Sequence, residues 1–90
     1  MPVKYQVAPE VISGNISEEA VLMSIESGAY YALDSVASRI WTLLSQEPAS
    51  VDELTEMLLR EYDVDEPTCR KDVEEFIRDM LKRKLLVEVK

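Results

Sequence analysis

The spacing of the apolar residues changes once along this chain, near Asp34, and this change constrains the fold more than any other feature. Before Asp34, short segments rich in β-branched and aromatic residues are interrupted by glycine, asparagine and proline, which is typical of strands. After Asp34, apolar residues recur at intervals of three and four, which is typical of amphipathic helices. Ninety residues with 47% apolar content suffice for one modest core. We therefore expect a single domain over residues 1–90 with an α+β fold.

Four short strands are predicted before Asp34, over residues 3–7, 11–16, 20–26 and 29–33. Ser27 and Gly28 between the last two suit a two-residue hairpin turn. That turn places Met23 opposite Ala32 in an antiparallel meander with residues 29–33 at its edge. In the same register Leu22 lies opposite Leu33. Both faces of the sheet then carry apolar side chains, so the face away from the helices needs additional cover.

Three helices are predicted after Asp34. Asp34 or Ser35 caps the first, which runs to about residue 46 and stops before Pro48. Residues 50–53 have the form of a capping box, in which the Ser50 hydroxyl accepts the Glu53 amide, and this box begins a second helix that ends near residue 62. The third helix begins at residues 65–67 and ends near residues 82–84, where three basic residues suit the C-terminal dipole. Residues 85–89 form a short terminal strand.

The composition argues against an enzyme. The chain has no histidine, which removes the commonest general base and metal ligand. One cysteine cannot build a thiolate zinc site, and two glycines cannot form a phosphate-binding loop. Adjacent carboxylates such as Glu74 and Glu75 point in different directions from a helix, whereas acid–base catalysis needs convergence in a cleft. We expect no catalytic residue, no metal and no cofactor.

The net charge of -8 disfavours nucleic acid and anionic bilayers as partners. The charge is uneven, since residues 1–66 hold 13 acidic and three basic residues, whereas residues 67–90 hold five acidic and seven basic residues.

Residues 1–7 lack the apolar run of a signal peptide, and no stretch approaches the roughly 20 apolar residues of a membrane span. Cys69 allows no intrachain disulfide, which agrees with a reduced, cytoplasmic setting. A reactive Cys69 thiol is the less favoured alternative to inert packing.

The third helix carries two apolar stripes. One comprises Cys69, Val73, Phe76 and Met80, and the other comprises Ile77 and Leu81. Either both stripes form one broad core face, or part of this surface borders a groove beside the edge strand. In the second interpretation we expect Cys69 and Met80 to line the groove and Phe76 to contact both core and ligand. Adjacent strand residues face opposite ways, so either Tyr30 or Tyr31 must leave the core side and is available to a partner.

These residues together resemble the PqqD-like family over about residues 11–87. The matching positions are Gly28-Ala29-Tyr30-Tyr31-Ala32-Leu33-Asp34, Ala37, Ile40-Trp41, Leu44, Ser50-Val51-Asp52-Glu53-Leu54, Asp72-Val73, Phe76-Ile77, Met80 and Leu85-Leu86. A chain of this length looks most like the stand-alone leader-binding branch of the family, known as RiPP recognition elements, in lasso-peptide biosynthesis. One departure is Lys84, where the family usually has glycine, and this puts the end of the third helix in doubt.

The resemblance implies a winged-helix-like fold, with a three-stranded antiparallel sheet followed by three helices. It also implies a peptide-binding adaptor, in which the leader segment of a ribosomally made precursor adds as a strand between the third strand and the third helix. The implied partners are a transglutaminase-like leader peptidase and, directly or indirectly, an ATP-dependent macrolactam-forming cyclase. The predicted leader-binding residues are Leu22, Ala29, Tyr30, Tyr31, Ala32, Leu33, Cys69, Val73, Phe76, Ile77 and Met80.

Three other functions stay open. The first is a related peptide chaperone for a radical SAM enzyme, in pyrroloquinoline quinone synthesis or another peptide-modifying pathway. The second is a DNA-binding winged helix, which the fold would allow and the acidic charge disfavours. The third is a plain structural domain whose groove is closed core.

Overall fold

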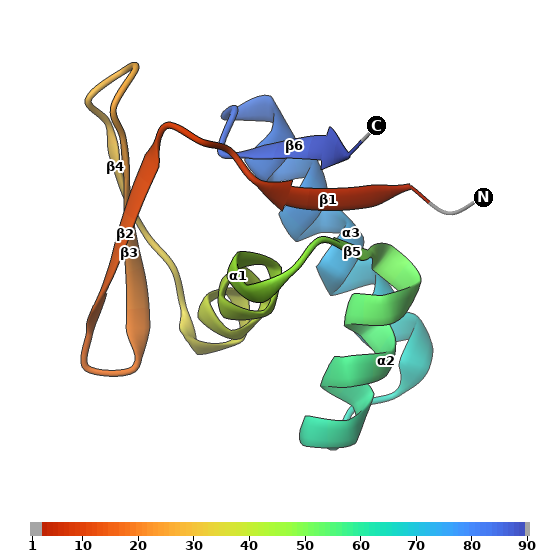
Figure 1. The fold of residues 1–90 in the computed structure, drawn as a ribbon. Coiled ribbons are helices and arrows are strands. Elements are labelled where there is room, and N and C mark those ends of the chain that lie inside the picture. The colour runs from red at the N-terminus through yellow and green to blue at the C-terminus, as the bar shows by residue number, and fades with distance from the viewer. Residues whose placement is uncertain (1–2, 90) are drawn as a thin grey trace.

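The computed structural model describes residues 3–89, which form two small antiparallel sheets and three helices. The predicted α+β class, with a three-stranded antiparallel sheet followed by three helices, is confirmed. Figure 1 shows β2 and β3 on one side of the molecule, α1 in the middle and α2 on the opposite side. The elements in chain order are β1 (Lys4–Val7), β2 (Val11–Ile16), β3 (Glu19–Ser24), β4 (Tyr30–Ala32), α1 (Ser35–Gln46), β5 (Ala49–Ser50), α2 (Val51–Glu61), α3 (Glu66–Lys82) and β6 (Leu86–Val89).

The N-terminal strand lies outside the predicted meander. β1 is the central strand of a separate sheet, with β5 on one side and β6 on the other. Ala8 extends this pairing, because its N–H donates to the Leu85 carbonyl at 3.0 Å, and Pro9 and Glu10 then turn the chain toward β2. The two ends of the described chain therefore lie side by side, as Figure 1 shows.

The loop between β3 and β4 is longer than predicted. The Ser24 N–H donates to the Ala29 carbonyl at 3.0 Å, so the loop holds the four residues 25–28 instead of two. Gly28 closes the loop with a φ of 73° and donates its N–H to the Ser24 carbonyl at 2.7 Å. Glycine adopts this left-handed conformation without a Cβ clash.

The longer loop shifts the register of β3 and β4 by two residues. Met23 pairs with Tyr30 instead of Ala32, and Leu22 pairs with Tyr31 instead of Leu33. Since side chains alternate between the two faces of a sheet, a shift of two keeps every side chain on its predicted face. The prediction of the faces was therefore right although the prediction of the register was wrong.

Side-chain hydrogen bonds cap the N-terminus of each helix, as predicted. The Asp34 carboxylate accepts the Ala37 N–H at 2.8 Å. Ser50 and Glu53 form a complete capping box, with bonds of 3.1 and 2.9 Å. Accepting the Ser50 N–H holds the pKa of the Glu53 carboxyl below its usual value. Asp65 caps α3.

No helix within residues 3–89 combines the length and apolar character that a bilayer crossing requires.

Lys84 ends α3 in the conformation that glycine usually supplies. Its φ is 63°, in the left-handed region. The Lys84 N–H donates to the Leu81 carbonyl at 3.1 Å, and the Leu85 N–H donates to the Met80 carbonyl at 2.9 Å. These bonds satisfy carbonyls in the last turn of the helix. The departure from glycine at this position therefore leaves the helix end intact and adds backbone strain.

Ser38 joins α1 to the sheet inside the core. Its buried hydroxyl accepts the Ala20 N–H at 2.7 Å and donates its O–H to the Leu33 carbonyl at 3.2 Å. The Leu33 N–H donates in turn to the Ala20 carbonyl at 2.9 Å. The end of β4 is thereby fixed to both β3 and α1. Around it, the largest fully buried apolar side chains are Leu22, Ile40, Leu54, Leu58, Val73, Leu85 and Leu86.

The backbone strain at Lys84 generates a stability prediction. We expect Lys84→Gly to raise the free energy of unfolding by about 1 kcal/mol, because a non-glycine residue in the left-handed region costs roughly 1–2 kcal/mol and the greater freedom of glycine in the unfolded chain offsets part of it. Lys71→Gly, at an exposed interior position of α3, is the matched control and should lower the free energy by about 1 kcal/mol. Urea unfolding measures both. Equal destabilisation by the two variants would contradict the assigned conformation.

Candidate functional site

β4 is an edge strand, as predicted, because its backbone is paired on one side only. It pairs with β3, and no strand within residues 3–89 pairs with its other side. Hydrogen bonds at both ends of β4 fix the phase of this pairing. The Ala29 carbonyl accepts the Ser24 N–H, and the Leu33 N–H donates to the Ala20 carbonyl.

The phase decides which backbone groups of β4 are free. Hydrogen-bonded and non-bonded residue pairs alternate along an antiparallel ladder. With bonded pairs at both ends of the strand, the bonded pair inside it is Leu22 with Tyr31. The N–H and C=O groups of Tyr30 and Ala32 therefore point away from β3. These four groups are available to a further strand.

The two tyrosines of β4 occupy opposite faces of the sheet. Tyr31 lies on the core side and is half-buried, with its ring centroid 5.0 Å from the Arg83 guanidinium carbon. Hydrogen bonds to Asp79, and secondarily to Tyr31, raise the pKa of Arg83. Tyr30 lies on the other face and is 72% exposed. Arg83 thus places the C-terminal end of α3 beside β4.

The predicted groove residues of α3 are divided between the core and its border. Cys69, Val73, Ile77 and Met80 are at most 4% exposed. Cys69 and Met80, which we expected to line an open groove, are therefore buried in this structure. Phe76 is half-buried at the edge of that face. The predicted site residues Leu22 and Leu33 are also buried.

Burial makes Cys69 an unreactive thiol. Removal from solvent raises its pKa, and the Asp72 and Glu66 carboxylates act in the same direction. Its Sγ lies 3.8 Å from the Thr55 carbonyl. The alternative of a reactive thiol has no support in this environment, because reactive thiols lie in exposed, electropositive surroundings.

An acid-lined pocket of about 520 Å³ lies between the first turn of α1 and the exposed side of α3. Phe76 and Ala37 contribute to its apolar wall. Among its carboxylates, Asp79 pairs with Arg83, whereas Asp72 and Glu75 form no ion pair within residues 3–89. The full lining is Asp34, Val36, Ala37, Ile40, Asp72, Glu75, Phe76 and Asp79.

Sequence reasoning missed the acidic part of this pocket. Asp72, Glu75 and Asp79 recur at intervals of three and four, so they form a stripe on α3 in the same way as the apolar residues do. This spacing was available in the sequence. Its relation to Ala37 of α1 was not, because it depends on how the two helices pack.

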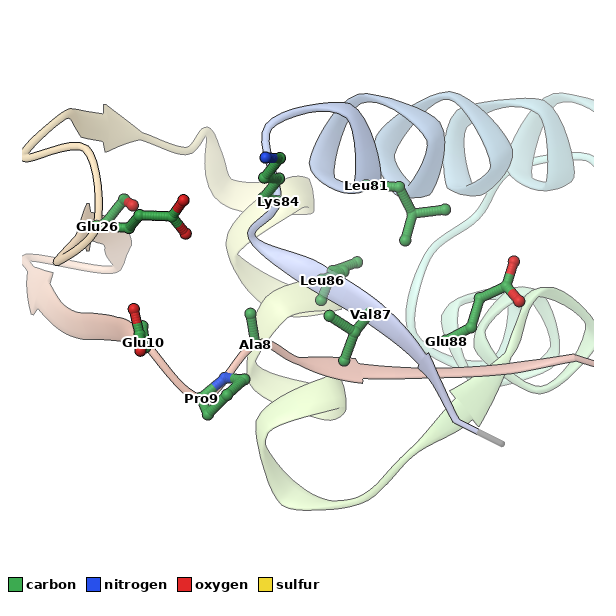
Figure 2. Close-up of a pocket in the computed structure, with 10 residues that line it drawn as sticks. Ala8, Pro9, Glu10, Glu26, Leu81, Lys84, Leu86, Val87 and Glu88 are labelled. Carbon is green, nitrogen blue, oxygen red and sulfur yellow. The ribbon is translucent and has the colours of Figure 1, made fainter.

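A larger open pocket, of about 640 Å³, lies where the two sheets meet the end of α3. Figure 2 shows Lys84 and Leu81 on one side of it, Glu10 and Glu26 near the hairpin end, and residues of β6 along its length. Its charged groups come from separate elements and include no nucleophile activated by a base. No group of three or more potential metal ligands occurs in residues 3–89.

The fold and the site define a winged-helix-like α+β module with an open strand edge beside a helix border. The chain belongs to the PqqD family, described as coenzyme PQQ synthesis protein D, whose sequence pattern matches residues 19–86. No curated protein sequence matches the chain.

Two solved structures share the fold. TbiB1 in complex with the TbiA(beta) leader peptide is 36% identical, with a TM-score of 0.84, and the match covers 90% of this chain and 93% of that chain. Lasso peptide synthetase B1 complexed with the leader peptide is 20% identical, with a TM-score of 0.81, and the match covers 92% of this chain and 96% of that chain.

The division of α3 generates a second stability prediction. Met80→Ala should lower the free energy of unfolding by about 2–5 kcal/mol, because it leaves a cavity in a closed core. Phe76→Ala should cost less, on the order of 1–2 kcal/mol, although phenylalanine is larger, since half-burial removes less area from water. Urea unfolding measures both variants. A Met80→Ala midpoint equal to that of the wild-type chain would show that Met80 lines an open groove.

Proposed function

We propose that this chain is a non-catalytic adaptor that binds the leader segment of a ribosomally made precursor peptide as a strand added to β4. The observation that carries the proposal is the open edge of β4, where the backbone groups of Tyr30 and Ala32 point away from β3. The C-terminal end of α3 lies beside this strand through the contact of Arg83 with the Tyr31 ring. The likeness to a 36% identical chain solved with a leader peptide supports the identity of the ligand.

Strand addition explains how a small surface binds a specific peptide. Backbone bonds to Tyr30 and Ala32 accept almost any sequence, and they provide affinity. Specificity then comes from alternate side chains of the leader, which point to the core side of the sheet. On that side they meet Phe76, Ala37 and the ring of Tyr31. Of the predicted leader-binding residues, this proposal keeps those that are exposed or half-buried, which are Ala29, Tyr30, Tyr31, Ala32 and Phe76. Cys69 and Met80 are buried and belong to the core instead.

The charges of the acid-lined pocket indicate which side chains a bound leader places there. Asp72 and Arg83 are about 16 Å apart along the helix axis, a span that about five residues of extended peptide cover. Asp72 and Glu75 lie at one end of this span without a counter-ion in residues 3–89. We infer that the leader places an apolar side chain against Phe76 and a lysine or arginine beside these two carboxylates.

An adaptor acts by raising local concentration. A leader held on β4 keeps the attached core peptide near any enzyme bound to the same module, in the millimolar range for a short flexible connection. We propose a transglutaminase-like leader peptidase and a macrolactam-forming cyclase as these enzymes. The family match also allows a radical SAM enzyme as the client, with the same binding mode. Titration with the precursor encoded beside this gene, leader and core separately, tests leader binding. The enzymes encoded by the neighbouring genes distinguish the clients.

The phase of β4 predicts which amides a bound leader protects. Saturating leader should slow hydrogen exchange at the Tyr30 or Ala32 amide, which face outward, and should change exchange at Tyr31 little, because that amide already bonds to β3. Residue-resolved NMR exchange measures all three. Tyr31 is the control within the same strand. Unchanged exchange at both Tyr30 and Ala32, with binding demonstrated by calorimetry, would exclude strand addition at β4.

The acid-lined pocket predicts an electrostatic contribution to leader affinity. Glu75→Gln should weaken binding about two- to fivefold at low salt, as expected for a partly exposed charge pair, and the loss should shrink at high salt. Glu74→Gln makes the same change on another side of α3 and should leave affinity unchanged. Titration calorimetry at two salt concentrations measures both variants. If Glu75→Gln and the wild type bind the leader with equal affinity, the proposed recognition of a basic leader residue by the pocket carboxylates is wrong. The proposal of strand addition at β4 would not be affected.

A further inference from the structure

The outer face of the sheet β2-β3-β4 is apolar and uncovered. We define this outer face as Ile12, Gly14, Ile16, Val21, Met23, Tyr30 and Ala32, the uncharged residues that the strand register places on one side of the sheet. Glu19, opposite Ile16, lies on the same side at the end of the sheet. Ile12, Met23 and Tyr30 form a row across all three strands. Ile12 is 52% exposed, and Ile16 is 69% exposed. The opposite face is covered by α1, as the bond between Ala20 and Ser38 shows.

The shape of the outer face suits a protruding side chain of a partner. A shallow hollow of about 350 Å³ runs along it, lined by β2, β3 and Tyr30. Gly14 lies in this hollow, and a Cβ added there would meet nothing within 4 Å. Contiguous exposed apolar patches of this kind often mark interaction sites in soluble proteins.

Residues 10–33, the segment that forms the outer face, carry charges of one sign, and Lys84 at the end of α3 is a basic residue that shares a pocket with Glu10 and Glu26. Residues 10–33 contain four glutamates and no lysine or arginine. Glu18 and Glu19 lie at one end of the sheet, and Glu10 and Glu26 lie at the other. None of the four forms an ion pair within the described residues 3–89. A partner that brings lysine or arginine to both ends of the apolar face complements this arrangement.

The same charges disfavour a second copy of this chain as the occupant. Two outer faces in contact would bring two sets of four carboxylates together, in molecules that each carry a net charge of -8. Tyr30 favours a cationic partner instead, because its exposed ring can accept an arginine or lysine over its face.

We propose that the outer face docks a partner protein through an apolar patch bordered by lysine and arginine, and that this partner is an enzyme that processes the bound peptide. The choice of enzyme rests on the proposed function. The surface itself is distinct from the leader site, since the leader uses the backbone edge of β4 and the border of α3, whereas the partner uses side chains that point away from both.

The test measures two affinities on the same variants. The double variant Ile12→Ser and Ile16→Ser removes exposed apolar groups from the outer face. Ile25→Ser makes the same change in the β3–β4 loop, where the side chain is 56% exposed, and is the matched control. Binding to the leader peptidase and to the cyclase encoded with the precursor is measured by biolayer interferometry. Leader affinity is measured by calorimetry, and circular dichroism confirms the fold.

We expect the double variant to lose at least about tenfold in affinity for one of the two enzymes, with leader affinity within twofold of wild type, and the control to keep both. Affinity for that enzyme should also fall as salt rises. Unchanged enzyme binding in the double variant would overturn the inference, as would leader binding with no enzyme binding at all. Sedimentation that shows a dimer of this chain, dissociated by the double variant, would assign the face to a second copy instead. Enzyme binding without leader binding would overturn the proposed function and leave the docking surface standing.

Discussion

The hydroxyl of Ser38 is the interaction on which the candidate site depends. It satisfies the Ala20 N–H and donates to the Leu33 carbonyl, both inside the core. A buried backbone group without a partner costs about 1–3 kcal/mol, so this one side chain stabilises the junction where β4 leaves the sheet and α1 begins. Because Leu33 is bonded to both Ser38 of α1 and Ala20 of β3, the end of β4 is fixed next to the open edge formed by Tyr30 and Ala32.

The second constraint is the way in which α3 divides its apolar residues. Four of them close the core, and Phe76 and Leu81 are left half-buried at its border. A closed core beneath the site means that a peptide can dock on β4 with little rearrangement, which lowers the entropic cost of binding. The carboxylates of Asp72, Glu75 and Asp79 then occupy the solvent side of the same helix border. The buried apolar residues and the pocket carboxylates are thus neighbouring stripes of one helix.

β4 serves separate purposes with its backbone and its side chains. Its outward N–H and C=O groups form the candidate leader edge, whereas the side chains of Tyr30 and Ala32 belong to the outer face. A strand of three residues can do both because backbone bonds lie in the plane of a sheet and side chains stand perpendicular to it. For an adaptor this separation is useful, since a peptide and an enzyme can be bound at the same time without competing for the same atoms.

Local signals in the sequence determined the elements and the side-chain faces. The caps at Asp34 and Ser50 depend on residues three positions away, and strand alternation depends only on the pleat, so both predictions hold in the structure. The edge position of β4 was predicted for the same reason, from its place at the end of a meander.

Only the tertiary structure decided the register of β4, the partners of β1 and the buried side of α3. A turn of two residues and a loop of four are both compatible with Ser27-Gly28, and the bonds between Ser24 and Ala29 select the longer one. Likewise, a helix whose apolar residues span a broad face does not specify which of them reach solvent. That choice depends on α2, β6 and the other elements of the core that pack against α3, and it buried Cys69 and Met80 while leaving Phe76 half-buried.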